Sequence, residues 1–134
     1  MLNAVIVDAS AISRGLLNTV LTEGSYNVVG TTHTAALGYL MVQKYQPHVF
    51  CIALEQVEDG GDVVEQIRAN FPKTLIFIMS GALDAPTLPK AMARGVSGFI
   101  VKPFNADKVL RTIRATVIAM IKKQQGASTN TDGR

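Results

Sequence analysis

Three side chains that could carry chemistry each follow a short apolar run. Asp8, Ser80 and Lys102 follow three such runs, and Ala53 ends a fourth. Because the carboxyl ends of parallel strands meet at one edge of a sheet, we expect these four positions to converge on one crevice. A carboxylate and an ammonium group can pair there, whereas an alanine methyl supplies neither a nucleophile nor a metal ligand. We therefore predict a crevice in which Lys102 pairs with Asp8.

Alternating strands and helices are needed to place these residues together. Apolar runs rich in β-branched residues predict strands, and capping residues followed by helically spaced apolar positions predict helices. Ser10, Thr34, Asp62 and Asn105 are the expected N-caps, and Gly95 is an expected C-terminal cap. The strands are expected at 2–7, 26–31, 48–53, 74–79 and 98–101, and the helices at 10–24, 34–47, 62–72, 86–95 and from 105.

This alternation predicts the α/β class, with a doubly wound five-stranded parallel sheet. The right-handed crossover rule favours the flavodoxin-like strand order 2-1-3-4-5. The 134 residues are expected to form one domain over residues 1–123, followed by a loose polar tail over 124–134. Residues 54–61 are expected to form a loop of acids and paired glycines.

The helices should turn their large apolar residues toward the sheet. We expect an inward stripe in each of three helices, at positions spaced three or four apart. The stripes comprise Ile12, Leu16, Leu17, Val20 and Leu21 in the first helix, Leu37, Leu40, Met41 and Tyr45 in the second, and Val109, Leu110, Ile113, Val117, Met120 and Ile121 in the last.

Charge is unevenly distributed along the chain, although the net charge is only +3. Acids cluster in the middle of the chain, and lysines and arginines dominate its last third, which predicts one acidic and one basic edge. No apolar run reaches the ~18 residues that a membrane span requires. The N-terminus lacks a signal-peptide pattern, so a cytoplasmic location is expected. Cys51, the only cysteine, is expected to be a buried thiol.

The order of the motifs at the strand ends resembles the receiver domain of response regulators, close in size to the stand-alone CheY type. The resemblance rests on the segment Val5 to Ser10 with Arg14, on Ser80-Gly81, and on Lys102-Pro103-Phe104, and it covers residues 2–121. It implies a role in phosphorelay signalling. It also implies that Ser80 is the switch hydroxyl, Lys102 the site lysine and Phe99 the aromatic switch position, with a cis bond before Pro103.

The sequence departs from this family where the family carries its acids. Family members have two adjacent acids after the first strand and a phosphoacceptor aspartate at the end of the third. Asp8 matches the first acid, but Ala9 stands at the second and Ala53 at the phosphoacceptor. Since Val57 and Gly60 also depart from the motif that usually follows, a native degenerate sequence explains Ala53 better than an engineered change.

These departures predict a receiver that has lost its chemical input. Acyl phosphate formation needs a carboxylate nucleophile, so no residue is assigned a catalytic role and the chain is not expected to be an enzyme. Mg²⁺ prefers several oxygen ligands, and Asp8 is the only acid left, so metal binding should be weak or absent. The alternative is a working receiver in which a displaced acid such as Glu55 accepts the phosphoryl group.

A protein partner, or a second copy of the chain, is expected to bind the face formed by residues 86–95, 98–101 and the last helix. The resemblance implies this face, and basic residues concentrate there, including Lys90, Arg94 and Arg111. Nucleic acid is an unlikely partner because the chain has no helix-turn-helix pattern and only a modest net charge.

Overall fold

A five-stranded parallel sheet forms the centre of the computed structural model, which describes residues 1–82 and 86–132, with side chains as far as residue 124. The strands lie in the order β2-β1-β3-β4-β5, and all four neighbouring pairs are parallel, which confirms the predicted topology. The strands are β1 Asn3–Val7, β2 Asn27–Thr32, β3 Val49–Ala53, β4 Leu75–Ser80 and β5 Gly98–Val101.

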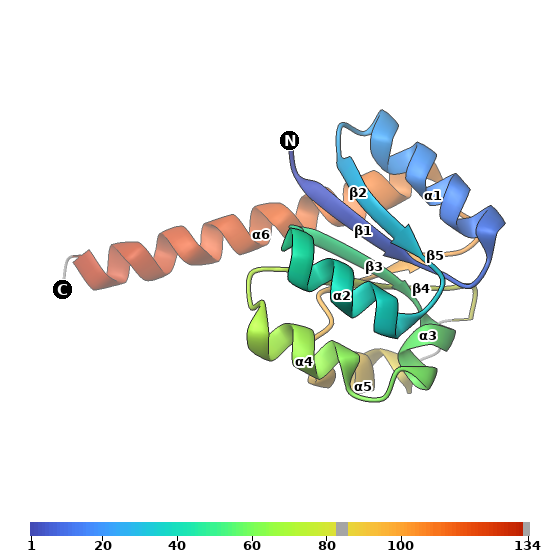
Figure 1. The fold of residues 1–134 in the computed structure, drawn as a ribbon. Coiled ribbons are helices and arrows are strands. Elements are labelled where there is room, and N and C mark those ends of the chain that lie inside the picture. The colour runs from blue at the N-terminus through green and yellow to red at the C-terminus, as the bar shows by residue number, and fades with distance from the viewer. Residues whose placement is uncertain (83–85, 133–134) are drawn as a thin grey trace.

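Helices cover both faces of this sheet (Figure 1). Apolar residues of α1 and α6 pack on one face, and those of α2, α3, α4 and α5 pack on the other. The helices are α1 Ala11–Glu23, α2 Ala35–Tyr45, α3 Leu54–Asp59, α4 Val63–Asn70, α5 Thr87–Arg94 and α6 Ala106–Asp132. The three inner strands, β1, β3 and β4, are therefore buried between two helical layers, as their nearly uncharged sequences predicted, whereas the edge strands β2 and β5 remain partly exposed.

Three of the four predicted N-caps form the expected hydrogen bond. Ser10 Oγ accepts a hydrogen bond from the Ser13 N–H at 3.2 Å, and Thr34 Oγ1 accepts one from the Leu37 N–H at 3.3 Å. The Oδ1 atom of Asn105 accepts a hydrogen bond from the backbone N–H three residues on, at 3.0 Å. Asp62 makes no such bond and instead accepts from the side chain of Gln66.

A short helix, α3, occupies most of the segment for which a loop was predicted. Val57 is 4% exposed and, with Leu54, packs against the cluster that lies beneath α2 and α4. One turn of helix brings these two residues, three apart, onto the same side. The predicted loop was wrong here because burial of Leu54 and Val57 favours a helix despite the acids and glycines around them.

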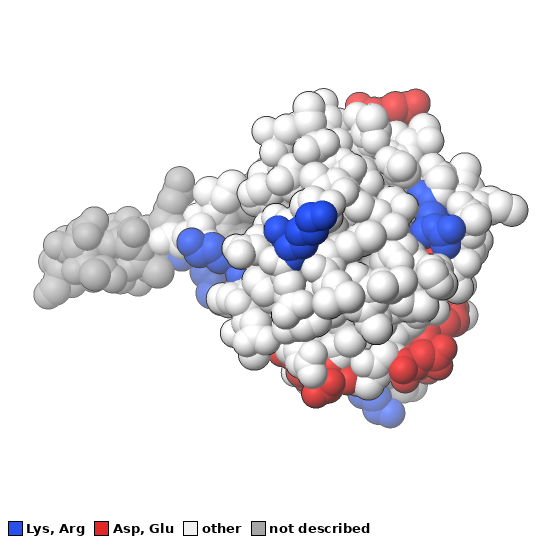
Figure 2. Space-filling view, viewed as in Figure 1, with Lys and Arg blue, Asp and Glu red and all other residues white. Residues whose placement is uncertain are grey.

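The buried face of α2 consists of small residues rather than the predicted large ones. Leu37 and Leu40 are 42% and 58% exposed, whereas Ala35, Gly38 and Val42 are buried. A Cβ on Gly38 would lie 2.5 Å from Cγ2 of Val7, so the helix approaches the sheet too closely for a side chain there. The side of the molecule on which α2 lies carries few charged residues on its surface (Figure 2).

The other predicted stripes are correct at their centres and wrong at some of their edges. Leu17, Leu21, Val109 and Ile113 are buried. Three members that were expected to face inward are more than 40% exposed: Ile12, Leu16 and Ile121. These helices cover the sheet with a narrower face than the sequence indicated.

The last helix differs from its predicted end. The sequence predicted a loose tail from residue 124, but α6 continues to Asp132 and projects past the body of the molecule (Figure 1). Gln124, Gln125 and Ala127 are good helix formers, but Gly126 and the Ser, Thr and Asn residues that follow are poor ones, so helix propensity did not indicate this extension.

Candidate functional site

Asp8 follows β1 at the carboxyl edge of the sheet and is 3% exposed. Its Oδ1 accepts a hydrogen bond from the Ser10 N–H at 2.9 Å. Its backbone carbonyl accepts a hydrogen bond from Nη1 of Arg14 at 2.7 Å, and its N–H donates to the Thr32 carbonyl at 3.0 Å. The carboxylate is therefore held in place by both its backbone and its side chain.

Lys102 follows β5, which lies three strands away from β1 in the sheet, and its side chain reaches the Asp8 carboxylate. Its Nζ lies 2.6 Å from Oδ2 of Asp8, which confirms the predicted pair. The side chains are 23% and 4% exposed, so this pair is shielded from water much more than a surface ion pair. The Lys102 N–H donates to the Ser80 carbonyl at 3.0 Å, and the bond before Pro103 is cis, as the resemblance implied.

Ser80 ends β4 and is 5% exposed. Its Oγ accepts a hydrogen bond from the Ala82 N–H at 3.0 Å. The hydroxyl therefore has a local partner within the turn that follows β4, and no hydrogen bond joins it to Asp8 or Lys102 among the described residues.

Ala53 ends β3, at the centre of the sheet, and is 1% exposed. It lies beside Met79 in the register with β4, and its methyl belongs to the apolar cluster beneath α1 and α6. The side chain at the end of β3 is thus apolar and also buried. Ala9, which follows Asp8, is exposed.

The side chains at this edge do not fit Mg²⁺. Oδ1 of Asp8 accepts from a backbone N–H and Oδ2 from Lys102, while Ala9 and Ala53 have no side-chain oxygen. Mg²⁺ requires close octahedral coordination by oxygen atoms. Within residues 1–82 and 86–124, no group of three His, Cys, Asp or Glu side chains is placed to hold a metal.

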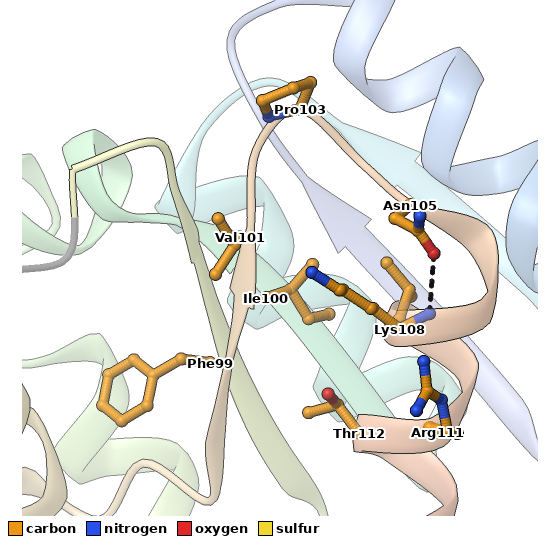
Figure 3. Close-up of a pocket in the computed structure, with 9 residues that line it drawn as sticks. Phe99, Ile100, Val101, Pro103, Asn105, Lys108, Arg111 and Thr112 are labelled. Carbon is orange, nitrogen blue, oxygen red and sulfur yellow. Dashed lines mark hydrogen bonds between the residues drawn. The ribbon is translucent and has the colours of Figure 1, made fainter.

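The face formed by α5, β5 and α6 carries the other predicted residues. Phe99 and Ile100 project to opposite sides of β5, as alternation along a strand requires (Figure 3). Phe99 packs against the cluster beneath α5, and Val101 is 61% exposed. A pocket of about 380 Å³ is lined by Phe99, Ile100, Val101, Pro103, Asn105, Lys108, Val109, Arg111 and Thr112.

The three cations predicted for this face differ in what they contact. Arg94 makes a bidentate pair with Glu65 of α4, with nitrogen–oxygen distances of 2.7 and 3.0 Å. These hydrogen bonds lower the pKa of Glu65 and raise that of Arg94. Lys90 and Arg111 are exposed. The structure thus turns Arg94 toward α4, while the other two cations remain at the surface.

Cys51 lies inside the sheet and is fully buried. Burial raises the pKa of its thiol to about 12, so the thiolate needed for redox chemistry or metal binding does not form near neutral pH. The thiol is part of the apolar core.

The arrangement is a doubly wound parallel α/β fold with Asp8, Ala53, Ser80 and Lys102 at the carboxyl edge of its sheet, and comparisons with known proteins assign it to a family. The family model of the response regulator receiver domain matches residues 4–114. The chemotaxis protein CheY of Listeria monocytogenes is 25% identical over 114 residues, which is 84% of this chain and 96% of that protein. An NtrX-like response regulator of Rickettsia conorii is 31% identical over 92% of this chain, but only over 27% of its own length.

Solved structures show the same fold. Chemotaxis response regulator CheY4 of Vibrio cholerae superposes with a TM-score of 0.78 at 24% identity, covering 87% of this chain and 98% of that one. NtrX from Brucella abortus gives a TM-score of 0.85 at 19% identity, covering 96% of this chain and 30% of that one. The chain belongs to the response regulator receiver domain family of two-component signalling. Within the described residues, no helix is long and apolar enough to cross a membrane.

Proposed function

We propose that this chain is a cytoplasmic receiver domain that binds a protein partner without accepting a phosphoryl group and without catalysing a reaction. One observation carries the proposal. The end of β3 holds a buried alanine methyl, while the neighbouring Asp8 carboxylate is paired with Lys102 at 2.6 Å.

The chemistry of phosphoryl transfer requires what this site lacks. An acyl phosphate forms when a carboxylate oxygen attacks the phosphorus of a donor and the donor's leaving group departs with the electron pair of its bond. The methyl of Ala53 has no lone pair with which to attack. The ammonium of Lys102 is already neutralised by Asp8, so it is not free to stabilise a phosphoryl oxygen.

Glu55 is a poor substitute nucleophile. It lies in the first turn of α3 and is exposed, whereas Val57 is buried against the sheet. Residues two apart on a helix lie about 200° from each other around its axis. Glu55 therefore belongs to the outer surface of α3, and a misplacement of even ~1 Å can cost about a hundredfold in rate.

The face made by α5, β5 and α6 is the partner surface we propose. Its pocket combines the exposed Val101 with the cations Lys108 and Arg111. Aromatic and apolar anchors surrounded by a charged rim suit protein recognition. The partner that fits would present an apolar side chain flanked by carboxylates, rather than a nucleic acid.

Incubation with acetyl phosphate and Mg²⁺, followed by intact-mass spectrometry, tests the absence of phosphorylation. We expect the wild-type mass to remain unchanged. The Ala9→Asp/Ala53→Asp double variant is the matched positive control, because it returns two acids beside Lys102 and Ser80. We expect this variant to gain the mass of one phosphoryl group.

Phosphorylation of the wild type would contradict the proposal if the adduct is labile in base, as an acyl phosphate is. The Glu55→Gln variant then identifies the acceptor. Loss of the adduct in this variant would establish the displaced-acid receiver instead.

A further inference from the structure

A groove lies at the opposite edge of the sheet from Asp8. Its volume is about 660 Å³, larger than that of the pocket at β5. It includes Leu75 at the start of β4 and Val96 and Ser97 just before β5, which places it at the amino ends of the strands. We call it the amino-edge groove, lined by Arg68, Pro72, Leu75, Gly95, Val96, Ser97, Thr116, Ala119, Met120, Lys123 and Gln124.

The amino-edge groove forms because α6 extends past the ends of the strands (Figure 1). Thr116, Ala119, Met120 and Lys123 are spaced three and four apart, so they share one face of α6. Earlier in the helix, Val109 and Ile113 cover the sheet. Past the end of the strands the helix has less sheet to cover, and the face ends in a groove with an apolar centre and Lys123 at its edge.

Arg68 supplies a fixed cation on the other side of the groove. Its Nε and Nη2 donate to the Gly95 carbonyl at 3.1 and 2.8 Å, and its Nη1 donates to the Pro72 carbonyl at 2.8 Å. A Cβ at Gly95 would lie 2.9 Å from Cγ of Arg68, and the backbone there has φ of +106°, so this close approach depends on glycine.

The charge of Arg68 has no carboxylate partner among the described residues. All its hydrogen-bond acceptors are neutral: two carbonyls and the Ser97 hydroxyl, which lies 3.2 Å from Nη2. Burial lowers the pKa of the guanidinium, and no nearby acid offsets that effect. Lys123 lines the same groove, and no described acidic side chain does. The groove therefore has an uncompensated positive charge beside an apolar wall.

We propose that the amino-edge groove binds a small amphipathic carboxylate, with the carboxylate beside Arg68 and Lys123 and the apolar chain against Met120 and Val96. The ligand's negative charge would compensate two cations that the protein leaves without a counter-charge. Its apolar part would cover Met120, and the volume of the groove falls in the range of about 300–1,000 Å³ that small-molecule sites occupy. The inference does not depend on whether the chain accepts a phosphoryl group.

A ¹⁵N–¹H correlation titration of the full chain with sodium octanoate tests this inference. Octan-1-ol and octylammonium serve as the neutral and charge-inverted probes of the same length. We expect saturable shifts at Val96, Ser97, Thr116 and Ala119 with octanoate, with a dissociation constant of about 6 mM, as the usual affinity per non-hydrogen atom predicts for a ligand of this size. We expect little effect of octylammonium on these four amides.

Two pairs of variants separate the groove from nonspecific binding. Lys123→Glu should weaken octanoate binding at least threefold, while Lys122→Glu, which changes the total charge equally outside the groove, should leave it unchanged. Met120→Ser should also weaken binding, whereas Ile118→Ser, on an exposed apolar residue outside the groove, should not. Arg68 is left intact because its hydrogen bonds support the fold.

The inference is overturned if octanoate gives no saturable shifts up to ten times the expected dissociation constant. It is also overturned if the three probes shift the same amides equally, or if the two members of either variant pair weaken binding alike.

Discussion

The two edges of the sheet each hold a shielded cation, but they hold it in different ways. At the carboxyl edge, Lys102 lies 2.6 Å from a carboxylate oxygen of Asp8. At the amino edge, Arg68 donates only to carbonyls and a hydroxyl. At the first edge the cation and the anion neutralise each other, whereas at the second the guanidinium of Arg68 has no carboxylate partner among the described residues.

This difference bears on how a receiver fold can change its use. At the carboxyl edge Asp8 and Lys102 pair with each other and Ser80 bonds within its own turn, while Ala9 and Ala53 supply no polar side-chain atom. Residues that serve chemistry in one context become structural in another when their partners are removed. In the function we propose, the partner surface at α5, β5 and α6 therefore matters more than the carboxyl edge.

Removing the acid at the carboxyl edge should have the largest effect on stability. Asp8→Ala leaves the Lys102 ammonium shielded without a partner and the Ser10 N–H without its acceptor. We expect the free energy of unfolding to fall by about 2–3 kcal/mol, less than the 3–5 of a fully buried pair because Lys102 keeps some solvent contact. Urea denaturation measures this change.

The Asp8→Ala/Lys102→Met double variant is the control for that prediction. It removes both charges, so it should recover part of the lost stability. Asp59→Ala, at an exposed position, should change stability by no more than about 0.5 kcal/mol. A double variant that is no more stable than Asp8→Ala alone would show that the ion pair is not what Asp8 contributes.

Removing the cation at the amino edge should cost less. Arg68→Met deprives the Gly95 and Pro72 carbonyls of donors, but it also removes a charge that pays a desolvation cost. We expect a loss of about 1–2 kcal/mol. Arg111→Met, at an exposed position, should stay within about 0.5 kcal/mol. A loss larger than that of Asp8→Ala would reverse the contrast between the edges.

The carboxyl edge could be predicted from the sequence because the topology alone brings its residues together. Once five apolar runs are recognised as parallel strands, the residues that follow them must meet at one edge. The pairing of Asp8 with Lys102 then follows from their opposite charges. The prediction needed no detail of side-chain packing.

The amino edge and the helix faces could not be predicted in the same way, because they depend on packing distances. The close approach of α2 at Gly38 buries small residues and leaves Leu40 exposed, which a hydrophobic pattern does not reveal. The amino-edge groove depends on the length of α6 and on Arg68 reaching Gly95. Arg68 donates to backbone carbonyls, so no acidic residue in the sequence indicates where this cation lies.

A second ion pair, Arg94 with Glu65, sharpens the comparison because it joins opposite charges at the surface. Its side chains are 31% and 46% exposed. Arg94 lowers the pKa of Glu65, so the unfolded chain binds the proton more readily than the folded one does. The stability from this pair is therefore present above the ordinary glutamate pKa of about 4.3 and is lost as the pH falls through the lowered pKa.

The effect should be the smallest of the three, below about 1 kcal/mol, because solvent screens an exposed pair. Denaturation curves of the wild type and of Glu65→Gln should differ at neutral pH and converge in acid, since the variant has no carboxyl group to titrate at this position. Glu58→Gln, an exposed acid on α3, is the matched control and should show no such convergence. A difference for Glu65→Gln that stays constant with pH would mean that its carboxylate gains nothing from Arg94.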